Sequence, residues 1–147
     1  MKKKNIVVIT VALMILMGSS FILRQTEPWR SDQLMEPKDL VAMITNKTPT
    51  EPLIINVGPA GLIKDAVDFG AAHEKENFEK LKDFLSNQKR DRQIVIYCGC
   101  CPFEHCPNVR PAFTLLNDLK FTNQKLLNLP HNLKADWINS GYPMAQQ

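Results

Sequence analysis

The stretch IVIYCGCCPFEHCPNVRPAF, residues 94–113, contains the patterns that decide the fold. Its first four residues are apolar, which predicts a buried β-strand over 93–97. Apolar residues at helical spacing begin at Val109 and predict a helix over 109–119. All four cysteines of the chain lie between these two elements, at positions 98, 100, 101 and 106. The stretch therefore predicts a strand, a thiol-rich loop and a helix in succession.

The same two patterns alternate along the rest of the chain. Short apolar runs predict strands over 53–57 and 125–129. Amphipathic spacing predicts helices over 36–44, 76–86 and 133–139. Strands that alternate with helices are typical of a parallel sheet covered on both faces. We therefore expect an α/β fold whose functional site lies at the carboxyl ends of the strands, where the cysteine loop begins.

The amino-terminal segment has the pattern of an exported protein. Three lysines, residues 2–4, precede 18 largely apolar residues, Ile6 to Leu23, and this order is typical of a secretory signal or a short hydrophobic membrane helix. The lysines favour a cytoplasmic amino terminus, which places the rest of the chain outside.

We therefore expect a signal peptide or membrane anchor over 1–24, a polar linker over 25–32 and one domain over 33–147. The domain is expected in the periplasm, or tethered to the inner membrane and facing the periplasm. If the anchor is retained, Trp29 is expected at the membrane interface.

The charge balance argues against one class of partner. The chain has 18 Lys and Arg against 15 Asp and Glu, and without Lys2, Lys3 and Lys4 both counts are 15. A nucleic-acid surface needs clustered Lys and Arg, so we expect no nucleic-acid partner. Contact with a membrane is expected only through the amino-terminal segment, if it is not cleaved.

The spacing of the cysteines argues against structural disulfides. A bridge within residues 98–106 would enclose fewer than ten residues, and such short loops remove little entropy from the unfolded chain. A reactive thiol fits the loop better, because the amides and dipole at a helix start stabilise a thiolate and lower its pKa. We expect Cys98 to be this thiol and Arg110, in the first helical turn, to hold an anion beside it. The alternative for Cys98 is a small buried apolar residue.

From Leu34 to Pro143 the sequence resembles a rhodanese-like domain. The resemblance rests on four stretches: LIINV at 53–57, IVIYC at 94–98, NVRPAFTLL at 108–116, and KLLNL at 125–129 followed by WINSGYP at 137–143. It implies a parallel sheet between helices and a catalytic cysteine that carries a persulfide sulfur. By this match Cys98 takes the position of the catalytic cysteine, and Arg110 takes that of the arginine at the helix start. The loop CGCCPFEHCPN is similar to that of a cysteine-rich subgroup of exported bacterial members.

The chain departs from the family pattern at two places near the site. Cys98 and Arg110 are twelve positions apart, whereas the family usually has a tight six-residue loop. Asn56-Val57-Gly58 stands where the family has Asp-Val-Arg, so the usual charge pair is missing.

Three functions remain open for the loop. The first is a sulfurtransferase or persulfide carrier, in which Cys98 attacks a small sulfur-containing anion or a persulfide donor and Cys101 or Cys106 resolves the product as a disulfide. The second is a redox protein that cycles two cysteines with a thiol-reductant partner. The third is a metal site of cysteines and His105, suited to zinc or copper(I). We favour the first, a sulfurtransferase that needs no cofactor or bound metal.

Overall fold

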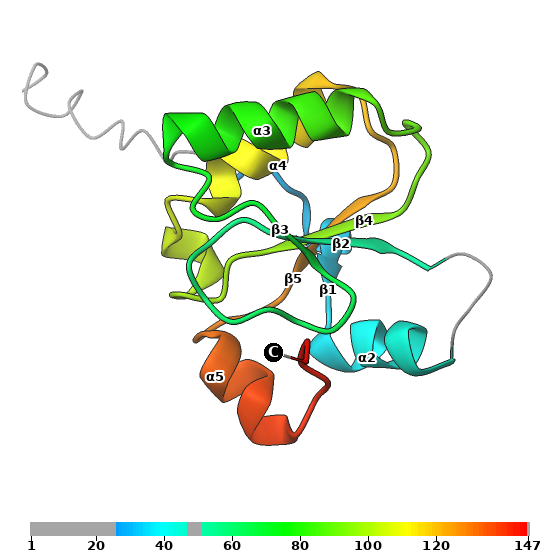
Figure 1. The fold of residues 1–147 in the computed structure, drawn as a ribbon, viewed down its shortest axis with the longest axis vertical. Helices are drawn as coiled ribbons and strands as arrows, with labels where there is room; N and C mark the ends of the chain where they lie inside the picture. The colour runs from blue at the N-terminus through cyan, green and yellow to red at the C-terminus, as the bar shows by residue number, and fades with distance from the viewer. Residues whose placement is uncertain (1–25, 47–50, 147) are drawn as a thin grey trace, which may run out of the picture.

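A five-stranded sheet forms the centre of the molecule in the computed structural model, which describes residues 26–46 and 51–146 (Figure 1). Its strands run in the order β1-β5-β4-β2-β3, and each neighbouring pair is parallel. The strands are β1 (Leu34–Met35), β2 (Leu53–Asn56), β3 (Val67–Asp68), β4 (Ile94–Tyr97) and β5 (Gln124–Leu127).

Helices cover both faces of this sheet. Figure 1 shows α3 (Lys75–Ser86) and α4 (Val109–Asp118) on one face, with α2 (Pro37–Asn46) and α5 (Leu133–Asp136) on the other. The described residues also contain three short 3-10 helices: η1 (Ser31–Gln33) before β1, η2 (Phe103–His105) between β4 and α4, and η3 (Ile138–Ser140) after α5. The α/β fold with helices on both faces is confirmed.

Strand β4 contributes to the apolar layers on both faces. Ile94 and Ile96 belong to the layer under α3 and α4, whereas Val95 and Tyr97 belong to the layer against α2 and α5, because successive side chains in a strand point to opposite faces. All four side chains are buried. This double burial explains why the strand reads as an unbroken apolar run.

Two edge strands are not predicted from the sequence. Strand β1 pairs with β5, and β3 pairs with β2. Each is two residues long, so neither contains enough residues to show a period. Both side chains of β3 are exposed, and this strand therefore carries no apolar signal either.

Part of the expected linker packs on the domain. The Trp29 ring is buried and makes edge contacts with Phe103 and Phe113, at centroid distances of 5.9 and 5.8 Å. The side-chain amide of Asn117 in α4 donates to the Pro28 carbonyl at 2.7 Å. The expectation that Trp29 is a membrane-interface anchor is therefore wrong, because its ring fills the core beside α4.

The predicted hydrophobic helix and leader, residues 1–24, lie outside the described residues. In 26–46 and 51–146, the helices are all too short or too polar to cross a membrane.

Candidate functional site

The cysteine loop begins at the carboxyl end of β4, the middle strand of the sheet. Cys98 follows the strand directly, and the neighbouring chain after β2 passes close to it. A Cβ atom on Gly58 would lie 2.1 Å from Cys98 Sγ and 3.0 Å from the Cys98 carbonyl oxygen. Any side chain at position 58 would collide with the thiol, so Gly58 provides the space that Cys98 occupies.

Tyr97 holds the loop after β2 from the opposite side of the sheet. Its hydroxyl accepts from the backbone N–H of Ile63 at 2.9 Å and donates to the Gly61 carbonyl at 3.3 Å. Burial raises the pKa of Tyr97 above its ordinary value, so the hydroxyl keeps the proton that it donates. The Gly58 loop is therefore fixed at both ends, by the strand and by Tyr97.

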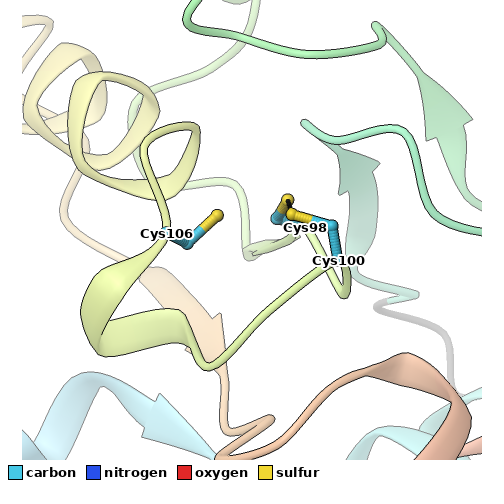
Figure 2. Close-up of side chains that lie close together, drawn as sticks. All are labelled: Cys98, Cys100 and Cys106. Atoms are coloured by element: carbon cyan, nitrogen blue, oxygen red, sulfur yellow. Dashed lines mark hydrogen bonds between the residues drawn. The ribbon is translucent and has the colours of Figure 1, made fainter.

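Three sulfur atoms gather beyond the end of β4. The Sγ atoms of Cys98, Cys100 and Cys106 all lie within 4.8 Å of one another, and Cys98 and Cys100 are 3.1 Å apart. Figure 2 shows Cys106, on the segment before α4, pointing toward the other two. All four cysteines are free thiols. Cys98 is 2% and Cys106 0% exposed, whereas Cys100 is exposed to solvent.

Cys106 is the thiol that ionises first. Its pKa is lowered to about 5, chiefly by the neighbouring Cys98 thiol, which can donate to a Cys106 thiolate. The backbone N–H groups of Asn108 and Val109, at the start of α4, lower its pKa further, and burial opposes them. Of the two sulfurs, Cys106 thus has the lowered pKa and favours the thiolate form.

The expectation that Cys98 itself is easily ionised is wrong. Its pKa is raised, first by the hydrogen bond to Cys106 and then by burial. The backbone amide of Cys100 and the side chain of Asn108 oppose these effects without outweighing them. The long loop is the physical reason, because it places Cys106 rather than Cys98 next to the helix start.

Cys101 lies at the edge of the three gathered sulfurs, next to Cys100. Its Sγ is 3.4 Å from that of Cys100, and its side chain is partly exposed. Burial and the neighbouring Cys100 raise its pKa to about 12. Cys101 therefore remains a thiol at neutral pH and is the weaker of the two predicted resolving cysteines.

Arg110 has partners other than the thiols. Its guanidinium donates to Glu27 Oε1 at 2.7 Å and to the Glu104 carbonyl at 3.0 Å. It also lies over the Trp29 ring, 5.5 Å from the centroid. Among the described residues it makes no hydrogen bond to a cysteine. The structure thus does not bring Arg110 together with Cys98, although the sequence places it in the first turn of α4 as predicted.

Asn108 is a site residue that the sequence reasoning missed. Its side chain is buried, and its Nδ2 donates to Cys98 Sγ at 3.3 Å. Its Oδ1 accepts from the backbone N–H of His73 at 3.0 Å and faces His73 Nδ1 at 2.7 Å. These contacts fix the amide with its N–H groups toward the thiol. An asparagine just before a helix is a recognisable capping signal. Here the side-chain amide donates to the Cys98 thiol instead and makes no cap hydrogen bond.

The missing charge pair is replaced by an amide contact. Asn56 is buried at the end of β2, and its Nδ2 donates to Asp68 Oδ1 at 2.9 Å and to the Gly58 carbonyl at 2.8 Å. Its Oδ1 accepts from the Gly58 N–H at 3.2 Å. The side chain thus ties β3 to the glycine that faces Cys98.

The parallel sheet between helices, with a thiol at the tip of its middle strand and a loop leading into a helix, defines a protein of the rhodanese-like fold. The chain is similar to the rhodanese-like domain of an Anabaena protein, with a TM-score of 0.54, 21% identity and coverage of 76% of each chain. It is also similar to a full-length protein from Lactobacillus plantarum, with a TM-score of 0.55, 16% identity and coverage of 97% of each chain.

These likenesses establish the fold. No protein-family model matches the sequence, and no curated protein matches it either.

Proposed function

We propose that this protein is a sulfurtransferase that carries a sulfane sulfur on Cys98. The rhodanese-like fold with a cluster of thiols supports a function of the sulfurtransferase type or a related one. The observation that carries the proposal is the gathering of the buried Cys98 and Cys106 sulfurs at the tip of the middle strand, with the Asn108 amide on Cys98 and a lowered pKa for Cys106.

The first step is attack on the donor. As Cys98 Sγ approaches the outer sulfur of a donor such as thiosulfate, its proton passes to the Cys106 thiolate. A new S–S bond forms at Cys98, the S–S bond of thiosulfate breaks, and sulfite leaves with the electron pair. Cys98 then carries a persulfide, and the amide N–H of Asn108, 3.3 Å from Cys98 Sγ, stabilises its negative charge.

The second step releases the sulfur. Cys106 returns its proton to the terminal sulfur of the persulfide and attacks Cys98 Sγ. A Cys98–Cys106 disulfide forms and hydrosulfide leaves. A thiol-reductant partner then supplies two electrons and one proton to restore the Cys98 thiol and the Cys106 thiolate. Cys106 suits this role better than Cys101, because it belongs to the group of sulfurs around Cys98 and its pKa is low.

The test is release of sulfite from thiosulfate by the reduced protein. The wild type should release about one sulfite per chain in a single turnover. Cys98→Ser should release none. Cys106→Ser should be slower by about 100-fold or more, the usual effect of removing a proton acceptor. Cys101→Ser is the matched control, because Cys101 lies in the same loop but is not one of the three gathered cysteines. This variant should release sulfite as the wild type does. Undiminished release by Cys98→Ser would reject the assignment.

We propose further that the domain works outside the cytoplasm. The support is the basic and apolar sequence of residues 2–23. A fusion of an exported-only reporter enzyme to the carboxyl end should be active in intact bacterial cells and should lose activity when residues 2–23 are deleted. Equal activity without that segment would contradict export.

A further inference from the structure

The three gathered sulfurs have a second chemical capacity, which does not depend on a sulfur donor. Cys98, Cys100 and Cys106 each offer one Sγ, and these atoms lie within 4.8 Å of one another. A metal ion about 2.3 Å from each of three thiolates needs sulfurs about 4.0 Å apart. The observed spacing is compatible with this value, since all three pairs lie within 4.8 Å and the Cys98–Cys100 pair, at 3.1 Å, would open by about 0.9 Å.

The donor set selects the kind of ion. It consists of sulfur alone, because the exposed His105 is not part of the group in the described structure. Thiolates prefer soft cations such as copper(I) and zinc. Structural zinc is almost always bound by four ligands, whereas this group supplies three. A three-thiolate set therefore favours copper(I) over zinc.

The surroundings can support the negative charge of such a site. Asn108 Nδ2 points at Cys98 Sγ. The start of α4, a ten-residue helix, places the amides of Asn108 and Val109 against Cys106, and its dipole favours negative charge there. Cys100 is exposed and gives an incoming ion a ligand at the surface next to the two buried ones.

We propose that Cys98, Cys100 and Cys106 form a three-coordinate binding site for copper(I). One Cu–S bond forms at each sulfur. The three sulfurs bind as thiolates, and any proton that they carry passes to solvent. No electron is transferred, because the ion enters and remains as copper(I). Copper on Cys98 would block sulfur loading, so the two uses of the site exclude each other.

The experiment uses the reduced full chain without oxygen and without a sulfur donor. Copper(I) is added in competition with a coloured copper(I) chelator, and bound copper is measured per chain. We expect one copper per chain in the wild type. Cys98→Ser, Cys100→Ser and Cys106→Ser should each lower the affinity by more than about 100-fold, since even loss of an outer-shell partner costs about 10–100-fold. Cys100→Ser is decisive, because this exposed side chain is not part of the core.

Two controls separate this site from its alternatives. Cys101→Ser and His105→Ala should leave the affinity unchanged. Equal loss of affinity in Cys101→Ser would overturn the three-coordinate site, as would full copper binding by Cys100→Ser or tighter binding of zinc than of copper(I). The copper measurement does not use the sulfite assay. Absence of copper binding would therefore reject the copper site without contradicting the sulfurtransferase proposal.

Discussion

Two cysteines of one loop differ in chemistry because of what lies beside them. Cys106 adjoins the amides at the start of α4, which have no partner inside the helix. Cys98 follows a strand, is 2% exposed and has a pKa that the neighbouring Cys106 and burial raise. The reactivity of Cys98 therefore depends on a proton acceptor eight residues away in the sequence.

The low pKa of Cys106 predicts a titration that one variant removes. The ultraviolet absorbance of one thiolate should be present at neutral pH and disappear as the pH falls through about 5. The pKa of Cys106 is lower in the folded chain than in the unfolded one, so its ionisation stabilises the folded state at pH values above the folded pKa. The free energy of unfolding should therefore decrease as the pH falls from about 9 to about 5. Cys106→Ser should lack both effects, and a titration unchanged in this variant would contradict the assignment.

Gly58 should be indispensable to the thiol that it faces. In Gly58→Ala the new methyl group would lie 2.1 Å from Cys98 Sγ, so the thiol or the strand end must shift. We expect loss of sulfite release and a decrease in the free energy of unfolding of about 1–3 kcal/mol, as for other overpacked sites. Gly61→Ala is the matched control, because its methyl group would meet only the side-chain ends of Met144, at 3.1 Å, and Leu133, at 3.7 Å. Normal sulfite release by Gly58→Ala would contradict this account of the site.

At the scale of elements, the start of α4 organises both the site and the packing of residues 27–29. Asn108 faces inward to Cys98 and His73, whereas Arg110 faces outward to Glu27. Arg110 therefore holds residues 27–29 against the start of α4. The negative charge of a donor would meet the amides of Asn108 rather than the guanidinium.

This arrangement predicts a small effect of replacing Arg110. Arg110→Gln should keep sulfite release close to that of the wild type and decrease the free energy of unfolding by about 1 kcal/mol or less, the usual range for a partly exposed ion pair. Glu27→Gln removes the same ion pair by changing its carboxylate. It should have the same small effects on sulfite release and on the free energy of unfolding. If Arg110→Gln abolished sulfite release while Glu27→Gln did not, Arg110 would bind the donor, as the family resemblance implies.

The sequence predicts the central elements because their patterns are local. β2 and β4 are each four buried residues in a row, and α3 and α4 bury residues at helical spacing. The site is harder to predict, because its contacts join distant residues. The pairing of His73 with Asn108 spans 35 positions, and the approach of Gly58 to Cys98 depends on the register of β2 with β4.

At the scale of the whole molecule, the sheet separates two apolar layers and brings the strand ends to one edge. The layer under α3 and α4 includes Trp29, Cys98 and Cys106, so the thiols lie at the border of a packed core. The neighbouring Cys106 and the burial there raise the pKa of Cys98 and favour its protonated form. The fold thus confines the reactive sulfur while Cys100 remains in contact with solvent.

The most direct test of this account is the mass of the reduced protein after brief exposure to thiosulfate, followed by mapping of the modified peptide. We predict a gain of one sulfur atom on Cys98. In Cys106→Ser, which loads about 100-fold more slowly and is exposed for correspondingly longer, the gained sulfur should be stable because the resolving thiol is absent. A protein that gains no sulfur, or gains it on Cys101 with Cys98 unmodified, would contradict the account.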